Sequence, residues 1–171
     1  MQTKQRIDLL EKNFATILAW ILGLDQKVNI LLALQGIILA LLIPGYLTTI
    51  VARFKTPHAI TFINAGIVII AAFLLGYSIV KSISAIYPRL GKKKTNTSHL
   101  YFGAIATYKL SDYKHDMKSL TEDKYTDELL EQIHINSIIA DKKHREFRDA
   151  LRYFVIGMIL FIVCYLSLKI S

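Results

Sequence analysis

Three long apolar blocks constrain this chain more than any other feature of its sequence. They are residues 28–51, residues 60–86 and residues 153–169, and a helix needs roughly 20 apolar residues to cross a bilayer. A soluble protein of 171 residues carries its apolar side chains in shorter periodic runs. Inside a bilayer, only helices and closed barrels satisfy their own backbone hydrogen bonds. The sequence therefore predicts an all-α membrane protein with three transmembrane helices.

Residues 1–27 form a different kind of segment. They begin with charged side chains and continue as "FATILAWILGLDQK", in which apolar residues recur at helical spacing. Trp20 suits the headgroup layer, where its ring is buried and its N–H stays hydrated. We expect a cytosolic, interfacial amphipathic helix that leads into the first span.

Three polar residues, Asp25, Lys27 and Asn29, stand at the mouth of the first span. Asp25 and Asn29 are four positions apart and share one helix face. Charges at that depth cost a few kcal/mol unless they reach the interface or a partner. Two interpretations stay open: the three residues mark the interfacial end of the helix, or they form a polar ring that gates a pore or contacts a neighbouring subunit.

The distribution of lysine and arginine predicts the orientation in the membrane, because cytoplasmic segments carry the excess of positive charge. The connection between the first two blocks has only Arg53 and Lys55. The connection between the second and third blocks is strongly basic. We therefore expect the N-terminus and residues 87–152 in the cytoplasm and the C-terminus in the periplasm of a bacterial inner membrane. The net charge of +8 then reflects orientation and attraction to anionic lipids, and no nucleic-acid partner is expected.

Residues 87–152 are too few for a large independent core. Ser111 is expected to cap a short helix, and Thr121, followed by two acidic residues, is expected to start a second one. No helix breaker follows Tyr125 before Gly157. The second helix is therefore predicted to run without interruption from this small helical cytosolic region into the third span.

This long helix has residues that alternate at spacings of three and four, which is the heptad pattern of helices that pack on one another. The seam runs from Leu130 to Phe154 and includes Ile133, Ser137, Ala140, His144, Phe147 and Leu151. We expect it to hold a homo-oligomer. The polar members of the seam set register, or His144 binds a ligand or senses pH. His134, Asp141 and His144 make only a weak metal site, so neither a metal nor a cofactor is expected.

Catalytic signatures are absent from the sequence. It has no phosphate-binding loop, no serine-hydrolase elbow, no Cys-x-x-Cys pair and no H-E-x-x-H zinc motif. The single cysteine, Cys164, lies inside the third apolar block and is compatible with a reducing cytoplasm. We expect a protein that is not an enzyme.

Two stretches resemble a known family, the Pycsar transmembrane effectors. The first is "LAWILGLDQKVNILLALQGIILALL", with a tryptophan followed by an acid and a lysine at the mouth of a span. The second is "SHLYFGAIA", residues 98–106, which is similar to that family's Ser-Leu-x-Phe-Phe-Gly-x-Ile-Ala signature. Tyr101 replaces the first phenylalanine, and His99 lengthens the step from serine to leucine. The layout of residues 108–154 is also similar.

The resemblance implies an anti-phage membrane effector. In such systems a partner cyclase makes cyclic CMP or cyclic UMP, and the effector then impairs the inner membrane, which stops the cell before the phage matures. The sequence shows no separate nucleotide-binding domain, so residues 87–152 would have to sense the ligand. A cyclic nucleotide needs an aromatic ring for its base and cations for its phosphate.

The candidate ligand-binding residues are Tyr101, Phe102, Gly103, Lys143 and Arg148. Gly103 would allow a sharp turn or a close backbone approach. Tyr101 and His99 would be available to the ligand, while the other apolar residues of the stretch pack on the long helix. Two alternatives stay open, a ligand-independent oligomeric membrane scaffold and a pore accessory of another defence system, such as one linked to CRISPR.

Overall fold

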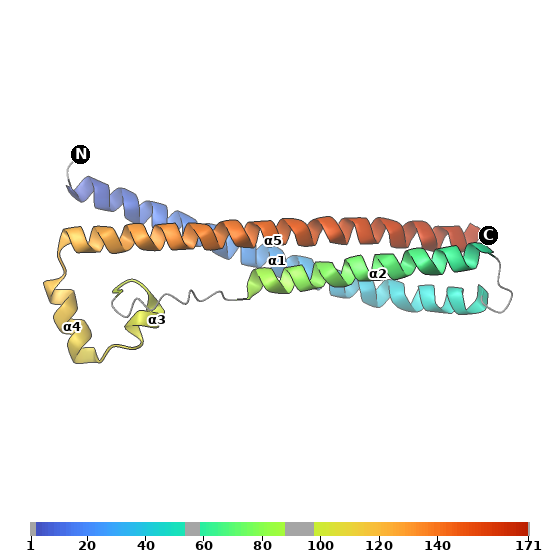
Figure 1. Ribbon diagram of the computed structural model, residues 1–171, viewed down its shortest axis with the longest axis horizontal. Helices are drawn as coiled ribbons and strands as arrows, with labels where there is room; N and C mark the ends of the chain where they lie inside the picture. The colour runs from blue at the N-terminus through green and yellow to red at the C-terminus, as the bar shows by residue number, and fades with distance from the viewer. Residues whose placement is uncertain (1–2, 54–58, 88–97, 171) are drawn as a thin grey trace. The chain divides into compact units, whose positions relative to one another are not determined.

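A computed structural model describes residues 3–53, 59–87 and 98–170, and all the regular structure in these ranges is helical. Three helices are long and two are short (Figure 1). They are α1 (Thr3–Arg53), α2 (Ala59–Ile86), α3 (Phe102–Ile105), α4 (Leu110–Ser119) and α5 (Glu122–Ile170).

The three long helices α1, α2 and α5 are each apolar enough over a sufficient length to cross a membrane. The predicted class, an all-α protein with three apolar helices of spanning length, is therefore confirmed. The helix predicted to continue without a break past Gly157 is α5, which is continuous over 49 residues. The cytosolic placement of residues 87–152 and the membrane limits 28–51, 60–86 and 153–169 stay predictions.

The chain divides into two compact units. The first unit combines Met1–Gly23 with Pro88–Lys142, and the second combines Leu24–Tyr87 with Lys143–Ser171. Both α1 and α5 contribute residues to each unit, whereas α2 belongs to the second unit and α3 and α4 belong to the first. The N-terminal segment thus folds with the region expected to be the sensor, a grouping that their distance in the sequence does not suggest.

In the second unit, α2 buries small and polar side chains and exposes large apolar ones. Its buried positions recur at spacings of three, four and, once, seven, as in a left-handed helical bundle. The buried residues are Thr61, Asn64, Ala71, Leu75, Ser78, Ser82 and Ala85. On the opposite face, Phe73 is 75% exposed. This inverted pattern is what a helix needs when lipid covers its outer face.

Two apolar clusters hold α1, α2 and α5 together within this unit. The first contains Tyr46, Ile50, Ala71, Phe161 and Leu168, and the rings of Tyr46 and Phe161 lie 5.3 Å apart between centroids. The second contains Leu31, Leu75, Ala150 and Phe154. Each of the two clusters contains residues of α1, α2 and α5, so the second unit is a three-helix bundle.

Gly157 allows α5 to approach α2 closely. A Cβ atom at this position would lie 2.9 Å from Leu75 Cγ and 3.3 Å from the carbonyl oxygen of Ala71. The second neighbour is backbone and cannot move without a shift of α2. Small residues at such contacts allow dense packing of membrane helices, which lack a hydrophobic driving force for association within lipid.

In the first unit, α5 begins where the sequence predicts, whereas α4 begins at a different residue from the predicted one. Thr121 Oγ1 accepts a hydrogen bond from the backbone N–H of Lys124 at 3.4 Å, so the predicted helix start is correct. The predicted cap at Ser111 is wrong, because α4 begins one residue earlier, at Leu110. Lys109 occupies the cap position without a side-chain hydrogen bond, and the Ser111 hydroxyl donates to Asp112 Oδ1 instead. Asp112 in the first turn offers the helix dipole a negative charge.

Candidate functional site

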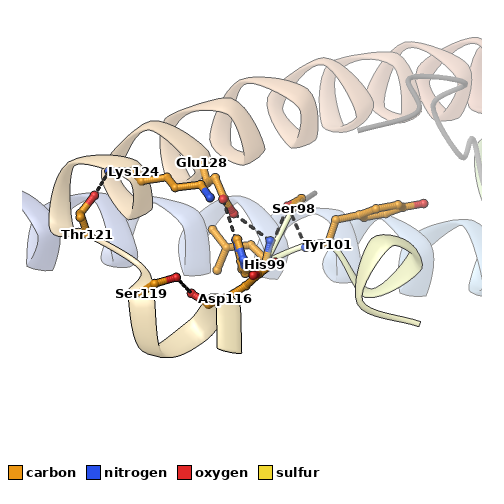
Figure 2. Close-up of polar contacts among 9 residues, drawn as sticks. Ser98, His99, Tyr101, Asp116, Ser119, Thr121, Lys124 and Glu128 are labelled. Atoms are coloured by element: carbon orange, nitrogen blue, oxygen red, sulfur yellow. Dashed lines mark hydrogen bonds and ion pairs between the residues drawn. The ribbon is translucent and has the colours of Figure 1, made fainter. Parts of the chain in front are cut away.

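In the first unit, two hydrogen bonds join His99 to the carboxylate of Glu128 on α5 (Figure 2). Nδ1 of His99 lies 2.7 Å from Glu128 Oε1, and the backbone N–H of His99 donates to Glu128 Oε2 at 2.8 Å. The His99 side chain is only 1% exposed. One carboxylate therefore fixes both the ring and the backbone of the segment that precedes α3.

Two tyrosine rings lie beside the His99 ring. The ring of His99 lies 6.1 Å from that of Tyr108 and 6.5 Å from that of Tyr113, and the two tyrosine rings are 5.8 Å apart. Burial raises the pKa of the Tyr108 phenol, and the carboxylates of Asp116 and Glu128 raise it further. The hydroxyl of Tyr108 therefore stays protonated at neutral pH and keeps its capacity to donate a hydrogen bond.

One polar atom of this cluster stays unsatisfied. Nε2 of His99 is buried and has no hydrogen-bond partner within the described ranges 3–53, 59–87 and 98–170. A buried polar atom without a partner is costly and is uncommon in native proteins. The His99 cluster, which we define as His99, Tyr108, Tyr113 and Glu128, therefore has one unused hydrogen-bonding position among aromatic rings.

The expectation that His99 is available to a ligand is wrong in this structure. His99 is buried and its Nδ1 side is committed to Glu128. A histidine in an apolar environment needs such a partner, and the partner is 29 residues away along the chain, so local sequence gives no indication of it. Only the Nε2 edge of the ring is unused.

Ser98 and Gly103 shape the turn that positions the predicted ligand residue Tyr101. The Ser98 hydroxyl accepts hydrogen bonds from the backbone N–H groups of Leu100 and Tyr101. The ring of Tyr101 points away from the His99–Glu128 pair (Figure 2). A Cβ on Gly103 would lie 2.6 Å from Tyr101 Cε1, so glycine leaves room for this ring. No described glycine has a positive φ, so Gly103 provides space rather than a left-handed turn.

The five predicted ligand residues fall in both units. Tyr101, Phe102 and Gly103 belong to the first unit, and Lys143 and Arg148 belong to the second. Phe102 starts α3, but its side chain lies outside the described part of the structure. Lys143 Nζ forms an ion pair with Asp25 Oδ1, whereas Arg148 is exposed. A nucleotide site that combines all five residues stays a prediction.

The three residues at the mouth of the first span differ in their surroundings. Asp25 is half-buried and pairs with Lys143, both within the second unit, while Lys27 and Asn29 are exposed. A second ion pair of this unit joins Lys81 Nζ to Glu146 Oε2 at 2.9 Å. These pairs connect α5 to α1 and to α2. The gating or pore role expected for Asp25, Lys27 and Asn29 stays a prediction.

The predicted seam of α5 is split between two environments. Ile133, Ala140 and Phe147 are half-buried and Phe154 is buried, whereas the residues seven positions apart at 130, 137, 144 and 151 are exposed. These exposed residues are Leu130, Ser137, His144 and Leu151. Within the second unit, the buried face of α5 starts at Ala150, one position before Leu151. An exposed stripe of two leucines, one serine and one histidine thus stays available for contact with a second chain.

Sequence reasoning missed Glu128, Glu146 and the buried polar residues of the bundle. Glu128 and Glu146 look like ordinary charges on a solvated helix. The polar residues of α2 were detectable, since Thr61, Asn64, Ser78 and Ser82 occur on one heptad face among large apolar residues. The regular spacing of these four polar residues on one helix face, rather than how many there are, indicates that they are buried.

These observations define an all-helical protein with three helices apolar enough to span a membrane, and comparison with known proteins identifies its family. The family model described as the Pycsar effector protein domain matches residues 9–169. The chain is 24% identical over 167 residues to the Pycsar effector protein GmPycTM of Gulbenkiania mobilis, covering 84% of this chain and 83% of that protein. No solved structure shows significant similarity. The chain belongs to the Pycsar effector family.

Proposed function

We propose that this protein is an anti-phage effector of the bacterial inner membrane, switched on by cyclic CMP or cyclic UMP, and that it impairs the membrane without catalysing a reaction. Membership of the Pycsar effector family and three apolar helices of spanning length support this proposal. The ligand and the membrane lesion follow from the family resemblance. Membrane lipids and other copies of the chain are its remaining expected partners.

The observation that favours a switch is the attachment of the His99 cluster to α5. Glu128 of α5 holds His99, and α5 continues as one helix to Ile170, past the predicted start of the third span. A ligand shifts a conformational equilibrium only by its different affinity for the two states. A nucleotide that loosens or tightens the segment around residues 98–108 would act directly on a helix with an apolar, membrane-spanning half.

The proposed nucleotide contacts are Tyr101, Phe102 and Gly103 with the cations Lys143 and Arg148. Tyr101 offers a ring for stacking, and Arg148 offers an exposed guanidinium for bidentate contact with the phosphate. Lys143 would have to exchange Asp25 for the phosphate, which would break this one ion pair between α5 and α1. The proposal therefore links ligand binding to the loss of one ion pair.

Tyr101→Ala and Arg148→Ala are each expected to weaken calorimetric binding of cyclic CMP and cyclic UMP and to abolish the dye release that these nucleotides trigger from liposomes. Losing a stacked base or a charge-assisted contact costs about 1–3 kcal/mol each, or roughly 5- to 150-fold in affinity. Arg152→Ala removes another exposed arginine of α5 and serves as the matched control. If neither nucleotide binds to the wild type and leakage does not respond, the sensor proposal fails and a ligand-independent scaffold takes its place.

A homo-oligomer is expected to form through the exposed part of the α5 seam. Leu130→Asp would place a charge in this stripe and should shift the detergent-solubilised protein toward the monomer in light scattering. Ile138→Asp is the control, because Ile138 is 55% exposed on the same helix but outside the seam. Phe147 is a poorer choice, since it packs against the apolar cluster of its own chain. A strictly monomeric wild type would contradict the expectation.

Topology provides an independent check. Reporter fusions at residue 95 and after residue 171 are expected to give opposite readouts, cytoplasmic for the first and periplasmic for the second, because the excess of lysine and arginine lies in the segment before the third span. Matching readouts would mean that an even number of spans separates the two positions.

A further inference from the structure

The second unit contains a buried polar layer that its helix packing does not satisfy. Gln35 Nε2 of α1 donates to Ser78 Oγ of α2 at 2.7 Å, and Ser78 Oγ donates to the carbonyl oxygen of Ala150 on α5 at 2.6 Å. Ser82 lies one turn further along α2 and is fully buried. Gln35 Oε1 and Ser82 Oγ have no hydrogen-bond partner among the described residues. We call Gln35, Ser78 and Ser82 the first polar layer.

A second polar layer lies further along the same three-helix bundle. The Ser167 hydroxyl of α5 donates to Asn64 Oδ1 of α2 at 3.0 Å, and Asn64 is 4% exposed. Asn64 Nδ2 is buried and finds no partner in the described part of the chain. Thr61, one turn away on the same face, is 2% exposed. We call Thr61, Asn64 and Ser167 the second polar layer.

Only apolar side chains occupy the buried face between these layers on α2. Asn64 and Ser78 are separated by 14 residues, which is about 21 Å of helix. Ala71 and Leu75 are buried between them, and Phe154 and Phe161 of α5 belong to the same two apolar clusters. We call these four residues the apolar seal.

Helix association explains part of this arrangement but not all of it. Interhelical hydrogen bonds join membrane helices, and the Gln35–Ser78 and Ser167–Asn64 contacts serve that purpose. The unsatisfied atoms of Gln35, Ser82 and Asn64 gain nothing from it, and apolar residues of similar size would pack at lower cost. Polar side chains that face the interior of a membrane bundle, beyond those needed for helix association, are placed to line a pathway for ions or water.

We propose that the interior of the second unit is a closed path for water and small ions, in which the apolar seal separates two polar layers. Apolar constrictions stop ions by excluding water, and a small separation of the helices is enough to hydrate them. Opening would bring water to Gln35 Oε1, Ser82 Oγ and Asn64 Nδ2, the atoms that the closed packing leaves unsatisfied. This inference rests on the proposed function, because it names the lesion by which the effector would impair the membrane.

The seal is tested by placing a hydroxyl in it without any nucleotide present. Full-length protein is reconstituted in liposomes that carry a potassium gradient and a trapped high-molecular-weight dextran dye. Phe154→Ser is expected to raise potassium efflux about tenfold over the wild type without releasing the dextran. Phe73→Ser makes the same substitution at a residue of α2 that is 75% exposed, and it should keep the wild-type rate.

A second pair guards against misfolding of the phenylalanine variants. Ala71→Ser adds a hydroxyl to the seal with little change in volume, and Ala72→Ser does the same at the adjacent, exposed position. Efflux is expected to rise for Ala71→Ser and not for Ala72→Ser. Equal efflux within both pairs, or efflux that always comes with dextran release, would overturn the closed path. Because no nucleotide is used, such a result leaves nucleotide-triggered leakage of the wild type as a separate question.

Discussion

Gly157→Leu is expected to lower the midpoint of thermal unfolding in detergent by roughly 10 °C, measured by circular dichroism. The new side chain would collide with Leu75 and with the backbone carbonyl of Ala71, so α2 and α5 would have to separate. Overpacking of this kind costs about 1–3 kcal/mol or more, and each kcal/mol corresponds to about 2–4 °C in a protein of this size.

Gly76→Leu is the matched control for this experiment. A Cβ at Gly76 on α2 would meet nothing within 4 Å, and the position is exposed. The control should therefore retain the wild-type midpoint or exceed it slightly, since leucine favours the helix more than glycine does. If Gly157→Leu and Gly76→Leu unfold at the same midpoint temperature, α2 and α5 do not pack closely at Gly157.

Glu128→Ala is expected to release the segment that precedes α3 from α5. The substitution removes the acceptor of the His99 backbone N–H and the partner of the buried His99 ring. Leaving these groups buried and unpaired costs about 1–3 kcal/mol each, so hydrogen exchange over residues 98–108 should accelerate on the order of 100-fold. Mass-spectrometric hydrogen exchange of the purified protein measures this change by segment.

Two further variants make the measurement specific to this contact. Glu128→Gln keeps a carbonyl acceptor for the backbone N–H and should fall between the wild type and Glu128→Ala. Glu131→Ala removes an exposed carboxylate from the same helix and should leave the exchange of residues 98–108 unchanged. Similar acceleration in the Glu131 and Glu128 variants would show that helix charge, and not the bond to His99, controls the segment.

The two variants act on different parts of the proposed switch. Glu128→Ala disturbs the His99 cluster of the first unit, whereas Gly157→Leu disturbs the helix packing of the second unit. If the first unit senses the nucleotide, Glu128→Ala should weaken nucleotide binding while the liposomes stay sealed. Comparing binding and leakage for both variants therefore separates sensing from membrane damage.

Local sequence was a poor guide to the chemistry of the candidate site. The stretch "SHLYFGAIA" resembles the signature of the Pycsar effectors, and the family that it indicates is confirmed. The expectation for His99 is wrong because its partner, Glu128, is the seventh residue of a helix that starts 23 positions after His99. The predicted Ser111 cap is wrong because α4 begins at Leu110, which places Ser111 inside the first turn, where its hydroxyl donates to Asp112 Oδ1.

Sequence alone determined the features that depend on short-range rules. The length and composition of the apolar blocks dictate three helices that are long and apolar enough to span a membrane, and the absence of breakers after Tyr125 dictates one continuous α5. Only the tertiary structure decided which distant polar groups meet. Lys143 and Asp25 are 118 positions apart, and Gln35 and Ser78 are 43 apart. Helical periodicity restricts each such residue to a face, but the partner across the bundle depends on helix register, and that register follows from packing at residues such as Gly157.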